Sequence, residues 1–169
     1  MNFGIIMKVK GEITMSEIKV CPNTKQEEVE YIKKMAADSS LFEGEVTEIT
    51  YMPGGLTNRN FKTVVDGKTY AFRIAGEGTA EYLNRPAERQ AVHAIKDLGI
   101  SPQFYYYDLS TGSNICGFCP GDTMHREDFQ ENAKVLQHAA KILNAFHHNN
   151  IQLKSTFDPL VEISNYMEW

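Results

Sequence analysis

Residues 46–74 read VTEITYMPGGLTNRNFKTVVDGKTYAFRI, and this stretch decides the fold class of the 169-residue chain. Runs of β-branched and aromatic residues are divided by the turn sequences PGG at 53–55 and DG at 66–67. Short runs of this kind between Gly, Pro and Asp turns are typical of β-strands, and tight turns join antiparallel neighbours. The stretch therefore predicts an antiparallel meander with strands at 46–51, 61–65 and 70–74.

The flanking sequence extends this meander into a domain. Downstream, residues 79–98 follow a helical pattern that Gly99 ends, and strand-like runs follow at 104–107 and 114–118. Upstream, Asn23 and Thr24 precede an amphipathic pattern that runs to Asp38, which predicts a short helix. We therefore predict an α+β fold, a five-stranded antiparallel sheet with one long helix.

The C-terminal part is helical in pattern. Apolar residues recur at helical spacing over 129–146 and again over 160–166. No capping residue follows Trp169, and the last apolar face has no later segment to pack against. We expect an incomplete second lobe, with self-association through its exposed helices. The expected parts are an N-terminal extension at 1–22 without fixed order, the sheet domain at 23–119, and the first helices of the second lobe at 120–169.

Composition excludes several classes of protein. The chain has 17 Lys plus Arg, 22 Asp plus Glu and a net charge of −5, with no basic block for a nucleic acid. The early apolar run, Phe3 to Met7, is far shorter than the roughly 20 residues of a membrane span. Three cysteines are too few for a disulfide scaffold. We expect a cytoplasmic protein without a nucleic-acid or membrane partner.

A glycine turn with polar neighbours is the strongest local sign of a binding site. Glycines let backbone N–H groups approach an anion, and hydroxyl and amide side chains add uncharged donors. The loop lacks the lysine and the following helix of a P-loop. An ordinary hairpin turn explains this stretch equally well when it is taken alone. The residues concerned are Gly54, Gly55, Thr57, Asn58 and Asn60.

Two opposite charges lie on the next strand and helix. Arg73 is on the third predicted strand and Glu88 is inside the long predicted helix. In a kinase small lobe, a cation on that strand binds nucleotide phosphates and a helix acid holds it in place. Arginine can bind a phosphate as well as lysine does. Taken singly, each residue also fits a solvated surface charge.

Four runs together resemble a known family: GGLTNRNFKT, YAFRIAGEGTAEYLNRPAE, LGISPQFYYYD and GFCPGDTM. They are similar to the small lobe of the choline/ethanolamine kinases, especially the bacterial choline kinases, over residues 45–168. The family is related to the aminoglycoside phosphotransferases, and its fold resembles that of protein kinases. The resemblance implies a kinase-like small lobe that continues into the first helices of a large lobe. The implied reaction is transfer of the ATP γ-phosphate to the hydroxyl of choline or a related amino alcohol.

The resemblance also implies roles for residues. The family's catalytic H-x-D-x-x-x-x-N loop and an acid that helps bind Mg²⁺ lie in the large lobe, beyond the matched segment. We therefore expect neither catalytic residues nor Mg²⁺ ligands in this chain. The implied ATP-binding residues are Gly54, Gly55, Thr57, Asn58 and Asn60 over the phosphates, Arg73 with Glu88, and the backbone of Gly117, Phe118 and Cys119 as the adenine hinge.

Two motifs suggest other chemistry. Residues 125–132, HREDFQEN, imitate the catalytic loop with Glu127 in place of Asp, but they begin six residues after Cys119 and run directly into a helical pattern. We interpret them as a helix start with acids in its first turn. Cys116 and Cys119 form a C-x-x-C, typical of a redox pair or half a zinc site, yet a Pro-Gly turn follows instead of a helix.

Two other functions stay open from the sequence. One is a non-catalytic small lobe that binds a nucleotide or another protein. The other is a phosphotransferase of the same fold that acts on another small hydroxylated substrate, such as an aminoglycoside, because the substrate-selecting residues of such folds lie in the large lobe.

Overall fold

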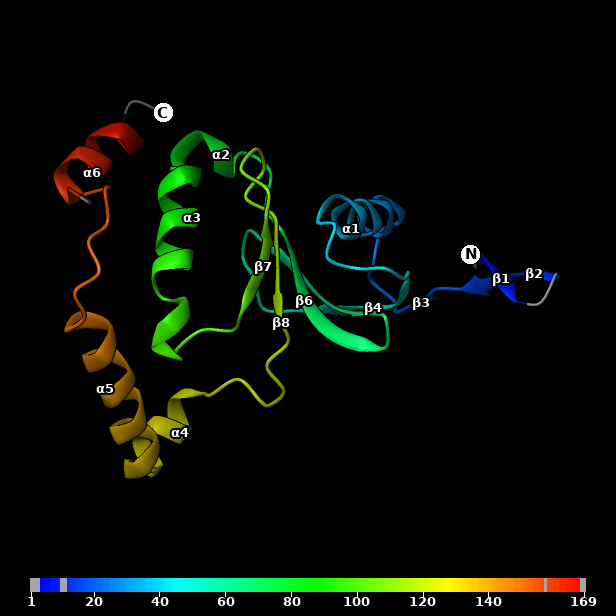
Figure 1. The fold of residues 1–169 in the computed structure, drawn as a ribbon. Coiled ribbons are helices and arrows are strands. Elements are labelled where there is room, and N and C mark those ends of the chain that lie inside the picture. The colour runs from blue at the N-terminus through cyan, green and yellow to red at the C-terminus, as the bar shows by residue number, and fades with distance from the viewer. Residues whose placement is uncertain (1–3, 10–11, 157, 168–169) are drawn as a thin grey trace.

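A computed structural model describes residues 4–9, 12–156 and 158–167 of the chain. Its centre is a six-stranded sheet with the strand order β3-β4-β5-β6-β8-β7 (Figure 1). Helix α1 lies on one side of this sheet and helix α3 on the other. The strands are β3 (Lys19–Val20), β4 (Val46–Met52), β5 (Arg59–Val65), β6 (Lys68–Ile74), β7 (Phe104–Tyr107) and β8 (Asn114–Gly117).

The predicted antiparallel sheet is confirmed. Strands β4, β5 and β6 form the meander, β8 pairs antiparallel with β6, and β7 pairs with β8. The one addition is β3, which pairs parallel with β4. Two residues are too few to show a periodic pattern, so this strand could not be predicted from the sequence.

The N-terminal extension expected at 1–22 contains two strands besides β3 among its described residues. Strands β1 (Gly4–Val9) and β2 (Glu12–Glu17) pair antiparallel in a separate two-stranded sheet. Their apolar residues include the consecutive run Ile5 to Met7, which hides the alternation typical of a strand. The next residue, Ile18, is 5% exposed and belongs to the core of the main domain.

Helix α1 (Gln26–Asp38) covers one face of the sheet as predicted. Its side chains Val29, Ile32 and Met35 are buried against Phe61 and Phe72 of the sheet. Burial of a large apolar side chain contributes roughly 1.5–3 kcal/mol, so this interface stabilises the domain. The predicted N-cap, Asn23 or Thr24, was one or two residues early. The N-cap is Lys25, whose N–H donates to the Glu28 side chain at 2.7 Å.

The single long helix predicted over 79–98 is wrong. The structure has α2 (Thr79–Tyr82), α3 (Arg85–Ala94) and a short 3₁₀ turn (Lys96–Leu98) in its place. Pro86 has no N–H to donate to the Tyr82 carbonyl, and its ring would clash with that carbonyl, so α2 cannot continue through this position. Asn84 starts a new helix there by accepting a hydrogen bond from the Ala87 N–H at 3.0 Å. The predicted end at Gly99 is confirmed by its left-handed φ of 67°.

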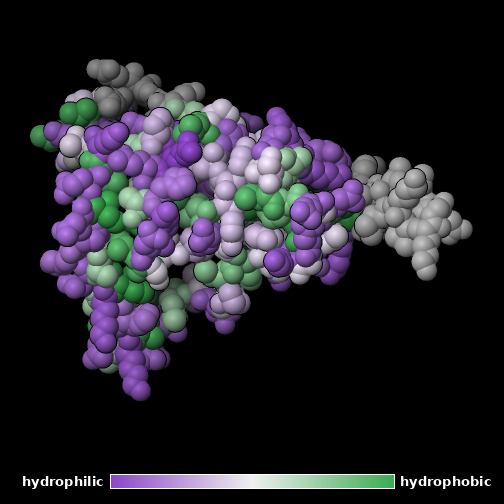
Figure 2. Space-filling view, in the orientation of Figure 1, coloured by the Kyte–Doolittle hydropathy of each residue, from purple (hydrophilic) through white to green (hydrophobic). Residues whose placement is uncertain are grey.

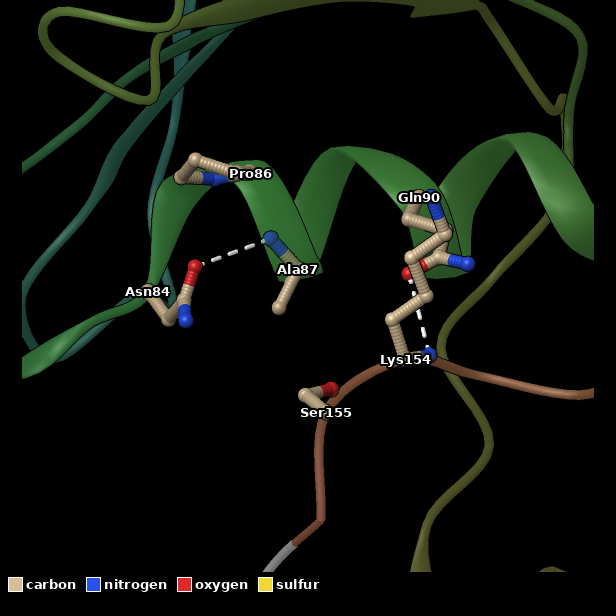
Figure 3. A pocket seen from close by; sticks show the side chains of 6 residues that line it. All are labelled: Asn84, Pro86, Ala87, Gln90, Lys154 and Ser155. Carbon is tan, nitrogen blue, oxygen red and sulfur yellow. Dashed lines mark hydrogen bonds between the residues drawn. The ribbon is translucent and has the colours of Figure 1, made fainter.

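The C-terminal region consists of α4 (Arg126–Glu131), α5 (Ala133–His147) and α6 (Pro159–Met167). The predicted helix over 129–146 is interrupted at Asn132, which has extended backbone and accepts a hydrogen bond from the Lys134 N–H. The segment after α5 returns to α3, where the Lys154 N–H donates to Gln90 Oε1 at 3.2 Å. Figure 3 shows the shallow pocket of about 380 Å³ between them, lined by Asn84, Pro86, Ala87, Gln90, Lys154 and Ser155.

Apolar side chains of the last two helices are exposed. Figure 2 shows them gathered on the side of the molecule formed by α5 and the segment after it. Leu136 and Leu143 of α5 are 56% and 55% exposed, and Leu160 of α6 is 74% exposed. Of the helices in the described ranges, none could serve as a membrane span.

Candidate functional site

The glycine loop joins β4 to β5 at one end of the sheet. Gly54 has a φ of +122°, which side chains rarely tolerate, and a Cβ on Gly55 would lie 2.3 Å from the Asn58 carbonyl oxygen. Both positions therefore need glycine in this conformation. The loop residues from Pro53 to Thr57 are exposed, so an anion can approach this loop from solvent.

Asn58 ties this loop to the segment that follows β6. Its side-chain Oδ1 accepts a hydrogen bond from the Gly76 N–H at 3.2 Å. The Asn58 side chain, which the sequence suggested as a phosphate donor, is thus held in the structure through its oxygen. Asn60 lies on β5 directly opposite Arg73 of β6, which places both side chains on the same face of the sheet.

Arg73 is held from three elements. Its Nη2 donates to Glu88 Oε1 of α3 at 2.5 Å and to the Gly112 carbonyl in the β7–β8 turn at 3.2 Å. When the Asn114 amide is oriented with its oxygen toward Arg73, that oxygen lies 2.9 Å from both Nη2 and Nε. The predicted ion pair between β6 and the following helix is therefore present, on the sheet face opposite α1.

Glu88 is the centre of a larger cluster. While Oε1 accepts from Arg73, Oε2 accepts from Arg85 Nη1 at 2.7 Å and from the Tyr107 hydroxyl at 2.5 Å. Burial alone would raise the pKa of Glu88, but the hydrogen bonds from Tyr107, Arg73 and Arg85 outweigh it and lower the pKa. Burial and the hydrogen bond to Glu88 raise the pKa of Tyr107 to about 12. Glu88 is thus held ionised and Tyr107 neutral.

Arg85 and Tyr107 were missed by the sequence reasoning. Arg85 lies three residues before Glu88 in α3, the spacing at which helical side chains meet. That spacing was a usable signal, because the helix predicted over 79–98 also contains both residues. Tyr107 comes from β7, a distant segment, and one aromatic residue in a strand of four gives no such signal.

The predicted hinge lies at the other end of β8. Gly117 ends the strand, and its N–H donates to the Gln103 carbonyl at 2.8 Å. The Phe118 ring lies 5.4 Å from Lys62 Nζ, and Cys119 is exposed. Asn114 and Gly117 are three residues apart on one strand, a distance of about 10 Å. Arg73 of β6 pairs with Asn114, so the hinge residues lie at the opposite end of β8 from Arg73.

The structure supports neither redox or metal chemistry at the C-x-x-C motif nor a catalytic loop at residues 125–132. Cys116 and Cys119 are free thiols, and burial raises the pKa of Cys116, the reverse of the shift that activates a redox thiol. Among the described residues, His, Cys, Asp and Glu form no group that could hold a metal ion. His125 is the N-cap of α4, where its N–H donates to Asp128 at 2.7 Å. The predicted helix start, with acids in the first turn, is confirmed.

A comparison with known protein families bears on the kinase interpretation of the sequence. A model of the choline/ethanolamine kinase family matches residues 49–169, a range that contains the glycine loop, the ion pair and the hinge segment. The chain belongs to the choline/ethanolamine kinase family. In sequence it is similar to the probable ethanolamine kinase B of Dictyostelium discoideum, with 28% identity over 141 residues, or 79% of this chain and 30% of that protein.

Solved structures of choline kinases are similar to the chain. It superimposes on LicA in complex with AMP with a TM-score of 0.70 and 26% identity, over 82% of this chain and 47% of that one. For the choline kinase LicA from Streptococcus pneumoniae the TM-score is 0.68 and the sequence identity is 26%, over 83% of this chain and 48% of that one. The chain thus spans less than half the length of each of these relatives.

This choline/ethanolamine kinase chain also has a pocket on the α1 face of the sheet. The pocket has a volume of about 690 Å³ and lies between the start of α1 and the ends of β5 and β6. Of the ten predicted ATP-binding residues, Thr57 is the one among its lining residues. Arg73 and Glu88 lie on the opposite face, so this pocket does not coincide with the predicted phosphate site.

Proposed function

We propose that the chain is the ATP-binding part of a kinase that transfers the γ-phosphate of ATP to the hydroxyl of choline or ethanolamine. The observation that carries this proposal is the position of Arg73. Its guanidinium is fixed by Glu88 on the sheet face beside the glycine loop, and its planar set of donors suits phosphate oxygens. The family membership and the AMP complex of LicA support the assignment to a nucleotide.

The residues fit a nucleotide. The glycine positions leave the loop N–H groups open to phosphate oxygens, and Arg73, at 30% exposure, can reach an anion from solvent. Asn60 lies beside Arg73 and adds an uncharged donor. The backbone of residues 117–119 would hold the adenine at the far end of β8. ATP supplies the phosphoryl group, while these residues bind and orient it.

The described residues do not fit the Mg²⁺ that accompanies ATP in this family. The carboxylate beside Arg73 is Glu88, and both of its oxygens already accept hydrogen bonds from cationic or phenolic donors. Mg²⁺ prefers oxygen ligands in octahedral geometry, which the arginine-rich surroundings oppose. This part of the chain therefore binds phosphates through Arg73 and the loop.

Nucleotide titration tests the proposal. We expect the chain to bind ATP, and Arg73→Met to weaken ATP binding by about 10- to 100-fold, since a hydrogen bond to a charged group contributes roughly 1.5–3 kcal/mol. Adenosine, which has no phosphate, should bind both proteins equally. Arg89→Met is the matched control, because Arg89 is an exposed arginine of α3. Isothermal titration calorimetry with ATP and adenosine gives all six affinities. Equal ATP affinity in the wild type and Arg73→Met would contradict the assignment.

The acceptor is tested separately. The relatives are named as choline and ethanolamine kinases, so we expect ATP consumption that depends on choline or ethanolamine in the protein that carries this chain. ADP release without either amino alcohol, or with an aminoglycoside alone, would contradict this acceptor.

A further inference from the structure

Arg85 is the most buried charged side chain of the Glu88 cluster. It is 6% exposed, and its Nε is buried without a hydrogen-bond partner among the described residues. Burial of a guanidinium is unfavourable unless its donors are paired, so an arginine that only filled space would be replaceable by an apolar side chain. Its two terminal nitrogens are each paired. Nη1 donates to Glu88 and Nη2 donates to Thr79 Oγ1 at 2.5 Å.

Thr79 connects this guanidinium to the glycine loop. The Thr79 hydroxyl donates to the Gly76 carbonyl at 2.7 Å, and the Gly76 N–H donates to Asn58 Oδ1 of the loop. Thr79 is 3% exposed, so its hydroxyl is shielded from competing water. A continuous series of hydrogen bonds therefore runs from Asn58 through Gly76, Thr79 and Arg85 to Glu88.

Gly112 makes room for this arrangement. It has a φ of +84°, and a Cβ there would lie 2.3 Å from Arg85 Cζ. The carbonyl of the same residue accepts a hydrogen bond from Arg73. The β7–β8 turn thus packs on one guanidinium and binds the other, which keeps the two arginines on separate oxygens of Glu88.

We propose that Arg85 is a positioning residue that holds Glu88 by Oε2, leaves Oε1 to orient Arg73, and connects this pair to the glycine loop through Thr79 and Gly76. The proposal rests on the proposed function, because the ligand oriented in this way is the phosphate chain of ATP. It adds that the loop and Arg73 form one cooperative unit. A lysine at position 85 has one nitrogen and could hold Glu88 or Thr79, but not both in this geometry.

Hydrogen exchange tests the connection without any nucleotide. We expect Arg85→Met and Thr79→Val each to raise the exchange rate of the Gly76 amide by about tenfold, since each breaks the series at one hydrogen bond. Thr79→Val is isosteric and keeps the Arg85–Glu88 ion pair, so it remains informative if Arg85→Met folds poorly. Arg89→Met is the control and should leave the rate unchanged. Unchanged exchange in both Thr79→Val and Arg85→Met would overturn the connection.

Nucleotide affinity tests the positioning role. We expect Arg85→Met to weaken ATP binding by about tenfold while adenosine affinity stays within about twofold, because the loss concerns the phosphate site. Arg85→Lys should recover most of the ATP affinity, because the lysine can still pair with Glu88. The exchange rate of the Gly76 amide in Arg85→Lys should nevertheless equal the rate in Thr79→Val. Equal loss of ATP and adenosine binding in Arg85→Met would overturn the positioning role. Absence of ATP binding in the wild type would refute the proposed function, while the exchange rates would still decide the connection.

Discussion

Glu88→Gln is the substitution that most directly tests the cluster around α3. The carboxylate accepts hydrogen bonds from Arg73, Arg85 and Tyr107, and it is the acidic partner of both guanidiniums. A glutamine keeps the shape but has one acceptor oxygen and a donor NH₂ group, which would face either a guanidinium or the phenol. The substitution therefore leaves Arg85, at 6% exposure, without a compensating charge.

The expected loss of stability follows from this burial. Removing one partner of a fully buried ion pair costs about 3–5 kcal/mol, whereas an exposed pair contributes about 0–1 kcal/mol. Arg85 is buried, but Glu88 and Arg73 are 26% and 30% exposed, so water screens part of the interaction. We expect a loss of about 2–3 kcal/mol in the free energy of unfolding.

Urea unfolding followed by circular dichroism measures this loss. Glu30→Gln on α1 is the matched control, because Glu30 is 55% exposed and pairs with Lys33 at 3.1 Å. The control should lose less than about 0.5 kcal/mol. If Glu88→Gln loses no more than this control, the cluster contributes no stability and the argument from burial is refuted.

Three further predictions follow from the same structure. Because the pKa of Glu88 is lowered in the folded chain, its contribution to stability is present above the ordinary value of 4.5 and is lost as the pH falls through the folded-state pKa. The urea midpoints of the wild type and Glu88→Gln should therefore approach each other as the pH falls below 4.5. Gly112→Ala should destabilise the chain by about 1–3 kcal/mol more than Gly99→Ala, since both positions have positive φ but a Cβ clashes with Arg85 only at Gly112; equal thermal shifts would contradict this. The apolar side chains exposed on α5 and α6 should make the isolated chain self-associate, which light scattering would detect as a mass that rises with concentration; a constant monomer mass would contradict it.

The sheet and its α1 face were predictable because their signals are local. The turns at 53–55 and 66–67 separate the strands of the meander, and the apolar period of residues 29–36 identifies the helix that packs on it. The errors in the helices have local causes too. Pro86 and Asn132 both interrupt helical patterns that are continuous in hydrophobicity, because a missing N–H or a side-chain cap acts on the backbone and leaves the apolar spacing unchanged.

Some residues of the candidate site could be predicted from the sequence and others could not. Its loop and the two charges Arg73 and Glu88 were predicted from the sequence, because they match the strand cation and helix acid of a kinase small lobe. Arg85 has a helical spacing from Glu88 that indicates a pair, but Tyr107 and Gly112 give no such signal, because their partners are distant in the chain. Tyr107 lies 19 residues from Glu88, and Gly112 lies 39 residues from Arg73.

The amino-acid sequence by itself determined the antiparallel meander and the amphipathic helix before it. These depend on turn residues and on periods of two and 3.6 residues, which neighbouring side chains specify. Tertiary structure alone decided that Arg85 is buried and that Glu88 divides its two oxygens between two arginines. Burial and hydrogen-bond partners depend on which distant segments pack together, and no local pattern encodes that contact.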